Sequence, residues 1–355
     1  MEKAPVPYPP VLHSLASAST ITWLIHQKFE LSIPLYRQEK EWEALGLRLS
    51  RATMSNWLLV VYRDWLVHIV HRLKLELLKQ RYLHIDETHV QVLKEPGRKN
   101  TSDSYMWVYC SIRDAVNPIR YFEYQPGRSG KYPEAFLREY EGYIHTDAYS
   151  GYNAVSGVKR CLCYTHLRRA FVDALPKDIH NSEASKPAEA ILRLNQLFNL
   201  ESELEALPPD QKKKERLIRE KPLLEAFWSW AEKSAIGELP KSKLSKAFHY
   251  ALNNREGFWN YLEDGNCSIS NSLAENCIRP FVIGRKNWLF SGSPKGAEAS
   301  AGIYTLVETA KANGLAPMKY IKYILSDMPG SAFLEHPEYL DDYLPWNPLV
   351  KEFCR

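Results

Sequence analysis

Tyr82-Leu-His-Ile-Asp-Glu-Thr-His89 has the composition of a β-strand, with β-branched and aromatic residues around a central carboxylate, Asp86. A second strand-like segment, Tyr143-Ile-His-Thr-Asp-Ala-Tyr149, carries Asp147 at its end. A third acidic residue, Glu275, opens a helix-like segment. Hard divalent ions such as Mg²⁺ take oxygen ligands, and a metal pair can clamp both oxygens of a phosphodiester. Two strand carboxylates and one helix carboxylate suit such a site.

The segments around the two aspartates predict a sheet with helices. The sequence predicts an antiparallel meander of three strands over residues 82–93, 105–113 and 119–125. Turns at Pro96-Gly97 and Asn117-Pro118 separate these strands. A helix over 132–141, strands over 143–146 and 160–164, and a helix from 167 follow. This order is that of a ribonuclease-H-like core, in which the first and fourth strands are neighbours. The predicted fold class is α/β with a mixed sheet.

The whole chain divides into five expected segments. An N-terminal arm and helical, helix-turn-helix-like region is expected over 1–80, with helices at 35–45 and 51–79 and Ser50 as an N-cap. This helical pair either contacts DNA or supports the core. The first part of the catalytic core follows over 81–177, an all-helical insertion over 178–265, the rest of the core with the third carboxylate over 266–328, and a C-terminal tail over 329–355.

Composition excludes several classes of protein. The net charge of +4 does not by itself indicate a nucleic-acid binder, since the clustering of charge matters more than its sum. The six cysteines form no disulfide framework, which fits a reducing, cytoplasmic location. No signal peptide and no apolar run of membrane-spanning length is present in the sequence, so no membrane partner is expected.

The run after Glu275 is the best candidate surface for DNA. Its basic residues can neutralise phosphates and its aromatic residues can stack on bases, although core packing is an equal alternative for the aromatic ones. Two arginines near residue 168 could bind phosphate or simply form a solvated helix face. The candidate DNA-binding residues are Arg279, Arg285, Lys286, Trp288, His166, Arg168 and Arg169.

Histidines and cysteines near the carboxylates raise the question of zinc. Cys163-x-x-His166, with Cys161 nearby, supplies two or three ligands, whereas a structural zinc site needs four. The sequence therefore does not favour zinc. His84, His89 and His145 are expected to be structural or to orient the carboxylates, with direct metal ligation as the less favoured alternative. Glu87 is expected to point to the opposite face of its strand from Asp86.

Several stretches resemble the insertion-sequence-66 family of bacterial DDE transposases. They include His84-Ile-Asp-Glu-Thr88, His145-Thr-Asp-Ala-Tyr-Ser-Gly-Tyr152, Cys163-Tyr-Thr-His-Leu-Arg-Arg-Ala-Phe171 and Ile278-Arg-Pro-Phe-Val-Ile-Gly-Arg-Lys-Asn-Trp-Leu-Phe-Ser-Gly292. The resemblance implies a ribonuclease-H-like fold with Asp86, Asp147 and Glu275 as the catalytic and metal-binding triad. Asp86 would bridge two Mg²⁺ ions, with Mn²⁺ as a substitute, and the other two carboxylates would each hold one.

The resemblance also implies partners and an activity. The partners are transposon-end and target DNA, further copies of the chain in a homo-oligomer, and accessory proteins encoded by the element. The expected activity is metal-dependent DNA cleavage and strand transfer. Members of the family usually carry an additional N-terminal zinc-binding region, which this sequence lacks. Two alternatives stay open: a truncated transposase that only binds DNA or oligomerises, and a ribonuclease-H-like nuclease without strand transfer.

Overall fold

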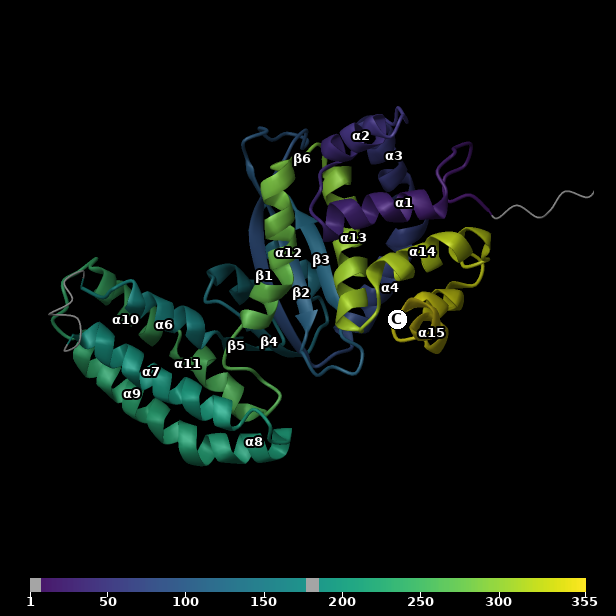
Figure 1. Ribbon diagram of the computed structural model, residues 1–355. Helices are drawn as coiled ribbons and strands as arrows, with labels where there is room; N and C mark the ends of the chain where they lie inside the picture. Colours follow the sequence, from purple (N-terminus) through teal and green to yellow (C-terminus); the bar gives the residue numbers. More distant parts are fainter. Residues whose placement is uncertain (1–7, 177–184) are drawn as a thin grey trace, which may run out of the picture. The chain divides into compact units, whose positions relative to one another are not determined.

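The computed structural model describes residues 8–176 and 185–355. These residues form two compact units (Figure 1). The first unit comprises Met1–Gln80, Asp86–Ser129 and Ala274–Arg355, and the second comprises Arg81–Ile85 and Gly130–Leu273. The chain therefore leaves and re-enters each unit, and strand β1 contributes residues to both.

The strands form a six-stranded mixed sheet in the order β3-β2-β1-β4-β5, with β6 also paired to β1. β2 and β3 are antiparallel, whereas β1 with β4, β4 with β5, and β1 with β6 are parallel. The strand bounds are β1 Tyr82–Val92, β2 Asp103–Ser111, β3 Arg120–Gln125, β4 Gly142–Thr146, β5 Val158–Leu162 and β6 Phe290–Ser291. The expected adjacency of the first and fourth strands is confirmed. The short β6 was not predicted.

The first unit is rich in helices from both ends of the chain. Ser50 caps α3 by accepting a hydrogen bond from the backbone N–H of Thr53, as predicted. The helix predicted over 51–79 is interrupted by a π-helical turn, η2, between α3 and α4. The helices are α1 Ala18–Ile25, η1 His26–Glu30, α2 Leu35–Ala44, α3 Arg51–Val61, η2 Tyr62–Leu66, α4 Val67–Leu78, α12 Ser272–Trp288, α13 Pro294–Ala312, α14 Pro317–Asp327, η7 Met328–Gly330, η8 Pro337–Tyr343 and α15 Pro348–Cys354.

Helix α13 covers the outer edge of β3. The backbone N–H of Arg120 donates to the Thr309 hydroxyl at 3.1 Å, and the backbone N–H of Phe122 donates to the Thr305 hydroxyl at 2.9 Å. Each hydroxyl can also donate to the carbonyl of the same strand residue. Unpaired strand edges promote association with other strands. The two threonines therefore satisfy backbone groups that β3 would otherwise expose.

The second unit packs helices around an aromatic core. Its buried cluster includes Tyr164, Phe171, Trp228, Phe248 and Tyr261. The described residues from 185 to 265 form helices and no strand, and the start at 178 expected for the insertion lies outside the described residues. The helices are α5 Lys131–Phe136, η3 Ser150–Ala154, α6 Tyr164–Val172, α7 Lys186–Glu203, α8 Pro209–Glu215, η5 Arg216–Glu220, α9 Lys221–Ala235, α10 Lys243–Asn253, α11 Arg255–Trp259 and η6 Asn260–Glu263.

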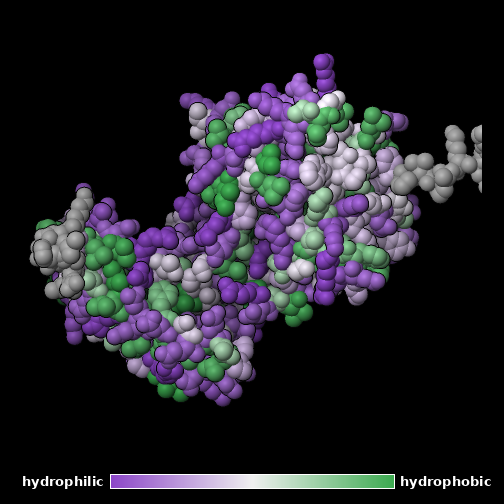
Figure 2. Space-filling view, in the orientation of Figure 1, coloured by the Kyte–Doolittle hydropathy of each residue, from purple (hydrophilic) through white to green (hydrophobic). Residues whose placement is uncertain are grey.

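The surface is mixed in polarity. On the face seen in Figure 2, hydrophobic residues lie in small patches between hydrophilic ones. Among the described residues, no helix is both long and apolar enough to cross a membrane.

Candidate metal and DNA-binding residues

The two candidate aspartates follow paired strand positions. In the second unit the parallel register pairs Tyr82 with Tyr143 and His84 with His145. Asp86 comes two residues after His84, and Asp147 comes two residues after His145. Both aspartates are partly buried, and each carboxylate accepts a nearby backbone N–H, from Glu87 at 2.9 Å and from Tyr149 at 3.0 Å. These bonds orient both carboxylates.

His84 and His145 are buried and stack face to face. Their ring centroids are 4.2 Å apart and the rings are inclined by 10°. The backbone N–H of Ser268 donates to Nε2 of His145 at 2.8 Å, so Nδ1 carries the proton and donates to the Leu83 carbonyl. Two stacked imidazoles would repel each other if both were charged. Their contacts match the structural role predicted for them.

Asn271 links strand β1 to the segment that precedes α12. Its side-chain oxygen accepts from Nδ1 of His84 at 2.9 Å, and its side-chain nitrogen donates to the Ile85 carbonyl at 2.8 Å. Its backbone N–H also donates to the sulfur of Cys163. Asn271 is buried, so these hydrogen bonds are shielded from water. Four residues later, Glu275 lies in the first turn of α12 and is partly buried.

Glu87 differs from its neighbour Asp86 in its contacts. Arg128 forms an ion pair with the Glu87 carboxylate at 2.5 Å, and the side chain of Glu87 is 1% exposed. Successive strand residues face opposite sides of a sheet. The arginine partner gives Glu87 a structural function that does not require a metal.

The basic, aromatic run forms the last turns of α12 and then β6. Arg279 and Lys286 are exposed. Arg285 donates to the Thr88 hydroxyl at 3.2 Å, and partial burial lowers the pKa of its guanidinium. Trp288 is partly buried, with the amino group of Lys28 5.1 Å from its ring centroid. Arg285 and Trp288 thus have contacts within the first unit, whereas the other two project into solvent.

The candidate DNA-binding residues of the second unit lie on α6. Arg169 is exposed, whereas Arg168 donates to the side chain of Asn195 at 2.8 Å. His166 is partly buried and interacts with the Cys163 thiol. Burial raises the pKa of Cys163, but hydrogen bonds from His166 and from the backbone of Asn271 outweigh it and hold that pKa below its usual value. One of the two adjacent arginines is therefore engaged inside the unit.

Cys161 and Cys163 belong to different clusters. Cys161 lies with His145 and Cys267, and their potential ligand atoms lie within 4.8 Å of one another. The hydrogen bond to Cys161, together with burial, raises the pKa of the Cys267 thiol. Both ring nitrogens of His145 take part in hydrogen bonds, one with the backbone N–H of Ser268 and one with the Leu83 carbonyl. Cys267 is distant from Cys161 in sequence, and the cysteine spacing gives no signal that these two residues lie together.

Lys28 is a chemically unusual residue that sequence reasoning missed. Burial lowers its pKa from 10.5 to about 8. Its amino group faces the rings of Phe29 and Trp288 at 5.4 and 5.1 Å from their centroids. Lys28 lies in η1 and is partly buried, and a single lysine gives no signal in the sequence that its amino group will be desolvated.

Comparison with known proteins identifies relatives over most of the chain. A family model described as "Transposase IS66 family" matches residues 13–299. The uncharacterized protein y4hP of Sinorhizobium fredii (strain NBRC 101917 / NGR234) is 25% identical over 367 residues, which cover 98% of this chain and 65% of that protein. The uncharacterized protein y4qI of the same organism is 28% identical over 356 residues, covering 94% and 63% respectively. This chain spans about two thirds of the length of these relatives, and by the family match it belongs to the IS66 transposase family.

Proposed function

We propose that this chain is the catalytic part of a DDE transposase, which cleaves DNA and joins strands on a ribonuclease-H-like core. Asp86, Asp147 and Glu275 would be its metal-binding carboxylates. The observation that carries the proposal is the parallel register of β1 and β4, in which each paired histidine is followed two residues later by an aspartate. Membership of the transposase family supports the assignment independently.

The donor chemistry of the three residues fits a hard divalent cation. All three are carboxylates, and all are partly buried rather than fully solvated. Mg²⁺ prefers such oxygen ligands, and Mn²⁺ accepts them too. When bound, a metal pair supplies activation of water or a 3′-hydroxyl and neutralises charge on the leaving oxygen.

The remaining residues would prepare the site and hold the substrate. The backbone amides of Glu87 and Tyr149 keep Asp86 and Asp147 in fixed orientations, which lowers the reorganisation needed for ligand binding. Arg279 and Lys286 would neutralise DNA phosphates from the exposed face of α12. Arg169 would do so from α6, and His166, Arg168, Arg285 and Trp288 remain candidate contacts. Phosphoryl transfer needs mainly positioning and charge stabilisation.

The test is DNA cleavage and joining by purified protein with Mg²⁺ or Mn²⁺. The substrate is DNA carrying the ends of the insertion sequence from which the gene comes. Asp86→Asn, Asp147→Asn and Glu275→Gln should each abolish both reactions while leaving the circular-dichroism spectrum unchanged. Glu134→Gln is the matched control, because Glu134 is an exposed carboxylate on α5, and it should retain activity.

The products distinguish this proposal from its alternatives. Cleaved DNA without joined strands would favour a nuclease on the same core. Salt-dependent DNA binding without any metal-dependent cleavage would favour a protein that only binds DNA or oligomerises. Cleavage that survives all three carboxylate substitutions would contradict the triad.

A further inference from the structure

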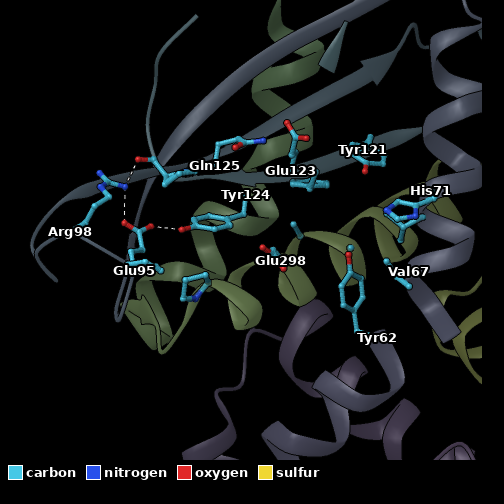
Figure 3. A pocket seen from close by; sticks show the side chains of 17 residues that line it. Tyr62, Val67, His71, Glu95, Arg98, Tyr121, Glu123, Tyr124, Gln125 and Glu298 are labelled. Carbon is cyan, nitrogen blue, oxygen red and sulfur yellow. Dashed lines mark hydrogen bonds and ion pairs between the residues drawn. The ribbon is translucent and has the colours of Figure 1, made fainter. Parts of the chain in front are cut away.

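The first unit contains a cavity that the proposed DNA chemistry does not use. Its volume is about 570 Å³, and it lies between β3, the loop after β1, α4 with η2, and the start of α13 (Figure 3). Tyrosines and carboxylates dominate its polar lining, and they include Tyr62, Tyr121, Tyr124, Glu95, Glu123 and Glu298. A cavity of this size accommodates a side chain and part of a peptide backbone.

The charges around the cavity favour a cation. Its lining holds three glutamates and one arginine, Arg98. Arg98 is engaged by Glu95, with Nη1 2.6 Å from Oε2 of that carboxylate, so this pair contributes no net charge. His71 also lines the cavity, but burial and the nearby Lys74 lower its pKa and favour its neutral form. The charges of Glu123 and Glu298 remain.

These two glutamates lack full compensation. Oε2 of Glu123 is buried and has no hydrogen-bond partner among the described residues. Burial raises the pKa of Glu123 despite the charge of Lys74 and side-chain hydrogen bonds with Gln125 and Tyr109. Glu298 is exposed at the rim of the cavity, and partial desolvation raises its pKa despite Lys295. A cation in the cavity would stabilise both ionised carboxylates. Lys295 is itself exposed to solvent and is not among the lining residues.

Tyrosine side chains line the same cavity as the Glu298 carboxylate. In Figure 3 this carboxylate is seen between the side chains of Tyr124 and Tyr62. Burial and the charge of Glu298 raise the pKa of Tyr62 to about 12, so its hydroxyl keeps its proton at neutral pH. Ammonium and guanidinium groups bind favourably to aromatic faces as well as to carboxylates. The cavity offers both kinds of contact.

The threonine hydroxyls that bond to the edge of β3 end at this cavity. The Ser111 N–H donates to the Ile119 carbonyl, so this residue pair is one of the hydrogen-bonded pairs of the β2–β3 ladder. Because such pairs alternate along an antiparallel ladder, the backbone groups of odd-numbered β3 residues bond to β2, and those of even-numbered residues point away from β2. Thr309 and Thr305 satisfy the outward groups of Arg120 and Phe122. The next outward residue is Tyr124, and the next position on α13, four residues before Thr305, is Ala301, which has no hydroxyl.

We propose that this cavity binds an extended segment of a partner protein that inserts a lysine or arginine side chain. The segment pairs with the backbone of Tyr124 at this edge of β3, and its cationic side chain lies against Glu298, Tyr62 and Tyr124. Addition of a strand to an exposed edge is a common mode of peptide recognition, in which pockets for side chains give specificity. Acidic lining excludes the DNA backbone as the occupant, because phosphates would be repelled.

The test measures binding of a fluorescein-labelled peptide to the full chain by fluorescence anisotropy, without DNA or added metal. The peptide alternates valine and threonine around a central arginine. Two further probes separate the contributions: the same peptide with norleucine at the centre, and arginine amide alone as a competitor. Glu298→Gln removes the charge, and Ala301→Thr places a third hydroxyl beside Tyr124. Glu352→Gln, an exposed carboxylate on α15, is the control.

Binding should weaken about tenfold with the norleucine peptide and with Glu298→Gln, since a charge-assisted contact is lost. Ala301→Thr should abolish binding, and its thermal unfolding transition should show that the variant still folds. Glu352→Gln should bind the peptide normally. Equal binding of both peptides, or unchanged binding by Glu298→Gln, would overturn the cationic site. The role of the strand edge would be overturned if arginine amide competed as strongly as the unlabelled peptide, or if Ala301→Thr bound the peptide normally. None of these results depends on DNA cleavage.

Discussion

Replacing Lys28 by methionine should stabilise the protein at neutral pH. Burial lowers the pKa of Lys28 from 10.5 to about 8. Each unit by which the pKa is lowered corresponds to about 1.4 kcal/mol, so keeping the amine charged in the folded state costs about 3 kcal/mol. Contacts with the Phe29 and Trp288 rings offset about 1 kcal/mol of this. Methionine fills a similar volume without a charge, so the expected gain in the free energy of unfolding is about 2 kcal/mol.

The gain should depend on pH in a defined direction. Below pH 8 the lysine is protonated in both the folded and the unfolded states, so the full penalty is present. Between pH 8 and 10.5 the unfolded chain binds more protons than the folded one, so the stability of the natural protein rises with pH. The advantage of Lys28→Met should therefore be largest at pH 7 and much smaller at pH 9.5.

Urea unfolding followed by far-ultraviolet circular dichroism at these two pH values gives the free energies of unfolding. Because other groups also titrate in this range, the informative quantity is the difference between variant and natural protein at each pH. Lys40→Met is the control, since Lys40 is exposed on α2 and its removal should change stability little at either pH. A Lys28→Met protein that is no more stable at pH 7, or equally stabilised at both pH values, would refute the reasoning.

Three further substitutions test the packing, each by urea unfolding. Asn271→Ala should lower the free energy of unfolding by about 2–3 kcal/mol, because it removes the buried hydrogen bonds with Nδ1 of His84 and with the Ile85 carbonyl; a loss below 1 kcal/mol would contradict this. Arg216→Met should cost about 3–5 kcal/mol, because Arg216 is 0% exposed, pairs with Glu201 and donates to the backbone carbonyls of Tyr261, Asp264 and Cys267; a loss below about 1 kcal/mol would contradict this. Gly302→Ala should cost about 1–3 kcal/mol, because the new Cβ would lie 2.0 Å from the Tyr62 ring; an unchanged midpoint would show that the ring moves freely.

Local sequence signals predicted most of the strands and helices. Alternating apolar and aromatic residues gave the bounds of β1, β2 and β3 to within two residues, and the Ser50 cap marked the start of α3. The adjacency of β1 and β4 followed from the order of elements, which the observed pairing matches. These features depend on neighbours in sequence or on a known order of elements, so one sequence was sufficient.

Features that depend on distant contacts were missed. The short β6 has two residues, and it is defined by its pairing with Gln91 and Val92 of β1. Phe290 lies in β6 with 45% of its surface exposed, whereas the aromatic residues of this run were expected to stack on bases or to pack in the core. Cys161 was grouped with its neighbour Cys163, yet its partner is Cys267. Spacing of cysteines along a chain does not determine which sulfurs meet after folding.

The cavity beside β3 shows why such a site is hidden in sequence. Thr305 and Thr309 lie four residues apart on α13, which reads as an ordinary helical spacing. Their function at the strand edge follows only from the β2–β3 register, which fixes which backbone groups of β3 face outward. Once that register is known, Ala301 in place of a third threonine becomes informative, because it marks where protection of the edge ends. The same position would be invisible to any argument from composition or periodicity, and Ala301→Thr tests it with a single hydroxyl.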